Sequence, residues 1–156
     1  GGHTPAHSLA QLNSFLQEKA SGKFATMFVL AASADGKAEF INAGHNPAYL
    51  FRAATGEIEE LNSNCMLVGA FEFAEFDTVP VQFQPGDVLI VYSDGLTEAE
   101  NPAGEMFGEG RVKEIMLREA PSGAEKLHEA ILESIQEYTR GRSQTDDITI
   151  ILAQYV

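Results

Sequence analysis

The spacing of apolar residues predicts a helix at the start of the chain. Leucines repeat at helical spacing from Leu9 to Leu16, and Thr4 followed by Pro5 suits the N-cap and first position of a helix. The pattern therefore predicts a helix over about 5–20.

Two hairpins are expected next. Residues 24–32 and 37–42 are apolar or alternating, and they flank Asp35-Gly36, a strong signal for a two-residue hairpin turn. The same pattern returns in 48–52 and 57–61, on either side of a turn that contains Thr and Gly. The region that follows, 62–72, has no period and is expected to be a loop.

Further along, strand signals give way to helix signals. Residues 79–83 alternate between apolar and polar side chains, and Pro80 favours an edge strand. A single helical turn is expected over 98–101 and a helix over about 109–119. The spacing of Ser122 and Glu125 resembles a capping box, and it predicts a long helix that runs to a stop at Gly141; its apolar positions are Leu127, Ile131, Ile135 and Tyr138.

Two acidic turns adjoin apolar strands. The strand Val88–Tyr92 is expected to be fully buried and to deliver Asp94 to a sharp turn, where a buried carboxylate needs a cation. Asp146 opens a second apolar strand, expected to be buried over about 147–155. If these strands are antiparallel neighbours, both carboxylates lie at one end of the sheet and suit magnesium, manganese or calcium. Alternatively, both aspartates are ordinary turn or cap residues.

Composition narrows the classes of function. The 156 residues, 44% of them hydrophobic, are enough for one domain, expected to span 1–156. Ten basic residues against 23 acidic ones give a net charge of −13, which disfavours nucleic-acid binding because phosphate contacts need cations. Cys65 is the single cysteine and fits a reducing compartment, more readily as a buried or idle thiol than as a nucleophile. No apolar run approaches the roughly 20 residues of a membrane span, so we expect a cytoplasmic protein.

Five short stretches are more specific together, and in this order, than any one of them alone. They are Phe24–Met27, Asn42–Pro47, Tyr92–Ala99, Met106–Gly108 and Thr145–Thr149. Together they resemble the bacterial metal-dependent protein phosphatase (PPM) family, most closely the branch of the stage II sporulation protein E and the sigma-factor-regulating serine phosphatases. The resemblance extends from about residue 8 to the end.

The resemblance implies an α+β fold, an αββα sandwich of two antiparallel sheets flanked by helices, with two manganese or magnesium ions at one end. It implies that Asp94 and Asp146 are metal ligands and catalytic residues, and that Asp147 supports them or the turn. Gly95 is then expected where the chain bends beside the metal. Two ions can bind a bridging hydroxide that hydrolyses a phosphomonoester without a covalent protein intermediate.

The chain departs from the family pattern at its N-terminus. Family members carry a preceding hairpin with a Gly-Asp motif and an aspartate that bridges both ions, and residues 1–23 supply neither; Glu18, the first acidic residue, lies in the predicted helix. We therefore expect an N-terminally truncated phosphatase domain that has weak or no activity alone and binds two, one or no ions.

Several side chains keep two interpretations each. His45 either orients water or phosphate near the metals, as its family position implies, or stabilises its loop through a hydrogen bond to the backbone. Glu98, with Thr97, either caps the helix after the metal turn or accepts a hydrogen bond behind a ligand. Arg140 and Arg142 approach phosphate or offset nearby acid, and the interpretation as solvated charge is preferred.

The leading hypothesis is a serine/threonine protein phosphatase domain that acts on a regulatory partner in sigma-factor or stress signalling. The resemblance implies that the partner is a phosphorylated anti-anti-sigma-type protein and that the parent protein carries or responds to a sensor domain. The alternative is a catalytically incomplete interaction module that recognises such a partner without hydrolysis. A third possibility is that the missing hairpin belongs to a longer parent enzyme.

Overall fold

A computed structural model describes residues 4–20, 22–142 and 146–156. Its helices and strands are α1 (Pro5–Lys19), β1 (Met27–Ala32), β2 (Lys37–Ala43), β3 (Ala48–Arg52), β4 (Glu57–Leu61), β5 (Val79–Gln82), β6 (Val88–Tyr92), α2 (Asp94–Thr97), α3 (Gly108–Glu119), the 3₁₀ turn η1 (Ala120–Ser122), α4 (Ala124–Thr139) and β7 (Ile150–Gln154). They form two compact units: Gly1–Pro47 with Leu61–Phe83, and Ala48–Glu60 with Gln84–Val156.

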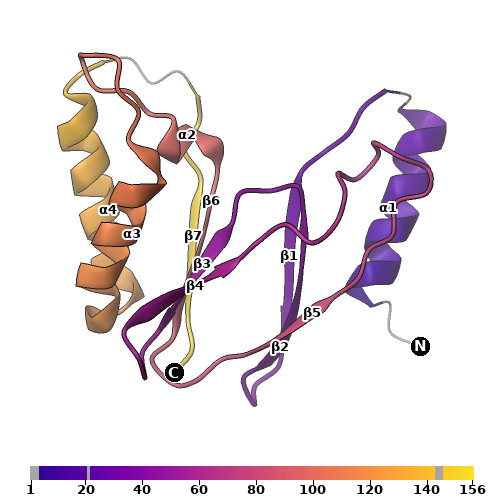
Figure 1. Ribbon diagram of the computed structural model, residues 1–156, viewed down its shortest axis with the longest axis horizontal. Coiled ribbons are helices and arrows are strands. Elements are labelled where there is room, and N and C mark those ends of the chain that lie inside the picture. The colour runs from indigo at the N-terminus through magenta and orange to yellow at the C-terminus, as the bar shows by residue number, and fades with distance from the viewer. Residues whose placement is uncertain (1–3, 21, 143–145) are drawn as a thin grey trace. The chain divides into compact units, whose positions relative to one another are not determined.

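The first unit contains a three-stranded antiparallel sheet in the order β1-β2-β5, with α1 packed against it (Figure 1). The helix begins as expected: Thr4 Oγ1 accepts a hydrogen bond from His7 N at 3.2 Å, and proline occupies the first turn. Its apolar face is buried in a core centred on Leu9, Ile41, Ala43, Val68 and Phe76. The edge position of β5 confirms the prediction made from Pro80, which has no N–H to donate.

The turn between β1 and β2 is longer than the two residues expected. Ser33 N donates to Lys37 O at 2.9 Å, which leaves a three-residue loop over 34–36. The Asp35 carboxylate closes this loop by accepting from Ser33 Oγ at 2.6 Å and from Lys37 N at 3.2 Å. Gly36 takes φ 79°, the left-handed conformation that a loop of this length requires.

The second unit is a four-stranded antiparallel sheet in the order β4-β3-β6-β7, with α3 and α4 on one face (Figure 1). The predicted pairing of β6 with β7 is confirmed, with a register that runs from Val88 opposite Gln154 to Tyr92 opposite Ile150. β6 is buried as expected. The prediction that β7 is buried was wrong: β7 is an edge strand, and the Ile151 side chain is 60% exposed.

The expected capping box before α4 is also absent. Ser122 ends the turn η1, and the N-cap is Gly123 with φ 102°. The capping acceptor comes from β7 instead, because Ala124 N donates to Gln154 Oε1 at 3.2 Å. Within the described parts of the chain, no helix combines the length and apolar character needed to cross a membrane.

An ion pair ties the turn before β6 to the end of β3. The Asp87 carboxylate is buried and accepts from Arg52 Nη1 at 2.8 Å, from Ala53 N at 2.9 Å and from Gln84 N at 3.0 Å. The sequence pattern identified this segment only as a turn. The contacts show that Asp87 also fixes β6 against β3.

Candidate metal centre

Asp94 lies directly after β6, where the strand becomes a helix. Ser93 is extended and forms the N-cap of α2, so the helical turn begins at Asp94 and not over 98–101 as expected. The Asp94 side chain is exposed, unlike the buried carboxylate that the strand pattern suggested. An exposed carboxylate stays solvated by water, so no cation is needed to offset a cost of burying its charge. The candidate site is therefore exposed to solvent.

Ser93 joins the Asp94 turn to the acidic segment before β7. Ser93 N donates to Thr149 O at 2.9 Å, and Thr149 N donates to Ser93 Oγ at 2.9 Å. Ser93 Oγ also donates to Asp147 O at 3.2 Å. These bonds continue the β6–β7 ladder beyond its last paired residues. The two acidic segments thus meet at the same end of the sheet, as the strand directions predicted.

Gly95 allows this close approach. A Cβ at this position would overlap the carbonyl oxygen of Asp147 and lie 3.5 Å from that of Asp146. Gly95 is not among the glycines with positive φ, so the requirement is for space and not for an unusual backbone conformation. A bend beside the metal was the reason expected for Gly95; the structure shows close backbone contact at this position.

The side-chain donors at this end of the sheet are the carboxylates of Asp94, Asp146 and Asp147. Asp146 and Asp147 are both exposed, and Asp146 Oδ1 accepts from Asp147 N at 2.8 Å. Among the residues that the structure describes, no three His, Cys, Asp or Glu side chains are grouped to hold a metal. Oxygen donors suit magnesium or manganese, which keep several waters. The described donors are thus of the chemical kind that suits a hydrated divalent cation.

The remaining predicted residues near Asp94 close its helical turn. Glu98 N donates to Asp94 O at 2.9 Å, and Thr97 Oγ1 donates to the same oxygen at 3.2 Å. Both contacts are those of the capping alternative. The Glu98 carboxylate is exposed, and a role behind a metal ligand stays a prediction.

His45 lies in the first unit, whereas Asp94 and Asp146 lie in the second. Its ring Nδ1 is 3.1 Å from Asn46 O, the backbone contact that the loop-stabilising alternative describes. The loop is organised by buried Asn42, whose Oδ1 accepts from His45 N at 2.9 Å and whose Nδ2 donates to Leu61 O at 3.1 Å. The alternation of strand residues gave no sign of this buried amide.

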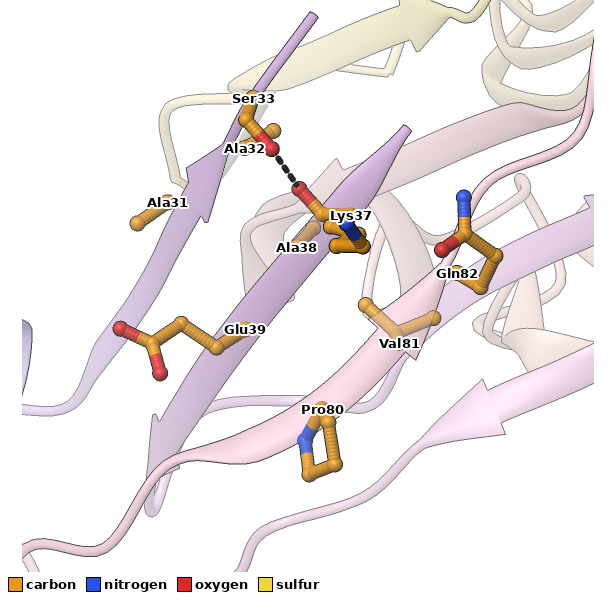
Figure 2. Close-up of a pocket in the computed structure, with 9 residues that line it drawn as sticks. All are labelled: Ala31, Ala32, Ser33, Lys37, Ala38, Glu39, Pro80, Val81 and Gln82. Carbon is orange, nitrogen blue, oxygen red and sulfur yellow. Dashed lines mark hydrogen bonds between the residues drawn. The ribbon is translucent and has the colours of Figure 1, made fainter. Parts of the chain in front are cut away.

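A groove of about 730 Å³ crosses the sheet of the first unit (Figure 2). Its lining is mostly aliphatic, and Ser33 Oγ donates to Lys37 O at 2.9 Å at one edge. Glu39 is its single carboxylate. None of the predicted metal-site residues lines it.

Two buried tyrosines lie beneath α3 in the second unit. The rings of Tyr49 and Tyr92 are 5.5 Å apart, and neither hydroxyl has a hydrogen-bond partner among the described residues. Burial raises the pKa of Tyr92 to about 12, and the carboxylates of Glu109, Glu60 and Asp94 add to the rise. Burial likewise raises the pKa of Tyr49.

Two antiparallel sheets with flanking helices, and two acidic segments joined at the end of one sheet, define a PP2C-type phosphatase fold. The SiaA-PP2C domain of Pseudomonas aeruginosa matches this chain with a TM-score of 0.83 and 21% identity, over 100% of this chain and 62% of that one. The profile of the Stage II sporulation protein E (SpoIIE) family matches residues 1–156. The chain belongs to this family, and the fold expected from the resemblance is confirmed.

Two curated relatives extend the comparison. Protein IcfG of Synechocystis sp. is 33% identical over 129 residues, which are 82% of this chain and 20% of IcfG. Phosphoserine phosphatase RsbU of Bacillus subtilis is 21% identical over 153 residues, which are 95% of this chain and 44% of RsbU. The chain thus spans a fifth of one relative and less than half of the other.

Proposed function

We propose that this chain is part of a metal-dependent protein phosphatase that hydrolyses phosphoserine or phosphothreonine on a regulatory partner protein. The observation that carries the proposal is the junction of the Asp94 and Asp146 segments through Ser93 and Gly95. Membership of the SpoIIE family supports it, as does the similarity to a protein named as a phosphoserine phosphatase.

In this proposal Asp94 and Asp146 hold magnesium or manganese, supported by Asp147. A bound ion supplies a hydroxide nucleophile from water at neutral pH and neutralises charge on the phosphoryl oxygens. The protein's own contribution is positional. Ser93 holds the Asp147 carbonyl, and Gly95 leaves room for it, so that the two acidic segments stay together before an ion arrives.

We further propose that the partner is a phosphorylated anti-anti-sigma-type protein and that the parent protein acts in sigma-factor or stress signalling under a sensor domain. These assignments rest on the resemblance of the five motifs to the sigma-factor-regulating branch of the family. The single cysteine, Cys65, suits a cytoplasmic setting.

Calorimetric titration with manganese chloride tests the site. Because two carboxylates provide few ligands, we expect weak binding, with a dissociation constant of about 0.1–1 mM. Asp94→Asn and Asp146→Asn should each weaken binding further. Asp77→Asn removes an exposed carboxylate in the first unit and should leave the titration unchanged. Equal binding by wild type and Asp94→Asn would rule out this site.

Phosphate release from a phosphoserine peptide, measured with and without manganese, tests the chemistry. We expect slow turnover that depends on manganese and is lost in Asp94→Asn. The alternative function, an interaction module that binds its partner without hydrolysis, is favoured by one observation: no third ligand joins the two aspartates among the described residues. Binding of the phosphorylated partner with no metal uptake and no turnover would support that alternative.

A further inference from the structure

A second groove, of about 540 Å³, lies within the second unit between the connection from α2 to α3 and the last turns of α4. Arg111 and Arg140 line it, together with Tyr138, Asn101 and Glu137. Two guanidinium groups and one carboxylate therefore face this groove. The charged residues of its lining are thus two arginines and one glutamate, in a chain whose net charge is −13.

Arg111 is held in a fixed orientation. Its Nη1 donates to Phe107 O at 2.7 Å, and its guanidinium carbon lies 4.5 Å from the centroid of the Tyr138 ring. Tyr138 is itself fixed, because its hydroxyl donates to Met106 O at 3.0 Å. A guanidinium stacked on an aromatic ring loses little further freedom when it binds an anion.

Arg140 follows α4 in an unusual backbone conformation. It is the one non-glycine residue with positive φ, 38°, among the residues that the structure describes. This left-handed conformation is normally left to glycine, and Gly141 at φ 81° comes next. A strained position that carries a functional side chain is typical of binding sites. Arg140 is exposed and lines the groove, and its Nε donates to Glu137 O at 3.2 Å.

The charge of this groove is not balanced by ion pairs. Within the described ranges, the lysines and arginines with no carboxylate partner are Lys23, Arg111 and Arg140. Two of these three share the groove. Arg142 nearby is neutralised, since its Nη2 lies 2.7 Å from Glu100 Oε2 and its Nη1 donates to Asn101 O at 2.8 Å.

We propose that this groove binds the carboxylate side chains of an acidic segment in the protein substrate. The guanidinium group matches a carboxylate with two parallel hydrogen bonds. The groove is formed in part by the connection that follows α2, the helical turn that begins at Asp94, and in part by α3 and the end of α4. Its assignment to a substrate rests on the proposed function; the acidic ligand rests on the groove itself.

Fluorescence anisotropy tests this inference on the chain as it stands, without metal. The probes are a short labelled peptide of alternating glutamate and serine and the matching glutamine and serine peptide. We expect the acidic peptide to bind at least about tenfold more tightly at low salt, and its affinity to fall as salt screens the contact. Arg140→Gln should weaken binding about fivefold or more.

Two variants make the test decisive. Lys126→Gln removes the same charge from the first half of α4, outside the groove, and should leave affinity unchanged. Arg140→Gly removes the side chain while relieving the backbone, so its loss of binding cannot be attributed to unfolding. Equal binding of both peptides, or equal loss in Lys126→Gln and Arg140→Gln, would overturn the inference.

Further measurements test the proposed function separately from the peptide-binding site. Asp94→Asn should bind the acidic peptide as the wild type does. If no manganese binding is detected while Arg140→Gln still abolishes peptide binding, the groove binds acidic segments but the proposed metal site, and with it the role in a phosphatase, is wrong. If turnover depends on manganese but does not distinguish a phosphoserine peptide with acidic neighbours from one with neutral neighbours, the assignment to the substrate is wrong.

Discussion

The backbone carbonyl of Asp147 occupies the space that a side chain on Gly95 would need. This close approach joins residues far apart in sequence, and the Ser93 hydroxyl donates to the same carbonyl at 3.2 Å. The arrangement of the candidate site therefore depends on a missing side chain as much as on the carboxylates that are present.

Gly95→Ala should lower the free energy of unfolding by about 1–3 kcal/mol, because the Asp147 carbonyl must move to admit the methyl group. Manganese affinity should fall with it. Gly110→Ala is the matched control: a Cβ there meets nothing within 4 Å. In α3 this control should be neutral or stabilise by about 0.5–1 kcal/mol. Urea denaturation measures both, and a neutral Gly95→Ala would contradict the contact.

Asp87→Ala should lower the free energy of unfolding by about 3–5 kcal/mol, because it leaves Arg52 without its buried partner. Glu59 is the other partner of Arg52, and its side chain is 47% exposed. Glu59→Gln should therefore cost less than about 1 kcal/mol. Similar losses in both variants, measured by chemical denaturation, would show that the buried bond is not the stronger one.

Arg140→Gly should raise the free energy of unfolding by about 1 kcal/mol, because glycine adopts the left-handed backbone without steric conflict. Arg140→Ala keeps the conflict and should change stability by less than about 0.5 kcal/mol. Thermal and urea unfolding of the two variants check this difference. Equal stability of the two would mean that residue 140 is not held in this conformation.

Tyr92→Phe should reduce the loss of stability at alkaline pH. The unfolded phenol titrates near pH 10, whereas burial raises the pKa of Tyr92 in the folded state to about 12. Above pH 10 the unfolded state loses the proton first, so stability falls until about pH 12, on the order of 2 kcal/mol in total. Below pH 10 this contribution is constant.

Unfolding free energies measured between pH 8 and pH 12 check this expectation. Tyr138→Phe removes a hydroxyl from a partly exposed tyrosine and serves as the control. At neutral pH, Tyr92→Phe should be neutral or stabilise by up to about 1 kcal/mol, because it removes a buried hydroxyl that has no described partner. An unchanged alkaline slope would mean that Tyr92 titrates normally.

Periodicity was a good guide where an element buries one face. α1 and α4 lie where the spacing of their leucines and isoleucines placed them, and the two hairpins are present. The directions of β6 and β7 were also predictable, since Asp94 follows one strand and Asp146 precedes the other. The roles of these aspartates as metal ligands stay predictions.

What the pattern missed are contacts between distant segments. The side chain that caps α4 is Gln154, which is far from the helix in sequence and reaches it only in the folded chain. The local capping signal at Ser122 was therefore misleading. The local sequence around Asp87 predicts only a turn, and its ion pair with Arg52 depends on the fold that brings the two residues together. The exposure of Ile151 follows from the edge position of β7, which depends on the strand order and not on local composition.

Because β6 and β7 are paired neighbours, the two acidic segments at their ends join the start and the end of the part of the chain that contains α3 and α4. Asp94 precedes α3 in the sequence, and Asp146 follows α4. A cation held by both carboxylates would join the two ends of that segment and would stabilise the folded chain, because the unfolded chain does not bring the two carboxylates together. Metal binding should then slow hydrogen exchange in α3 and α4 and leave exchange in α1 unaltered.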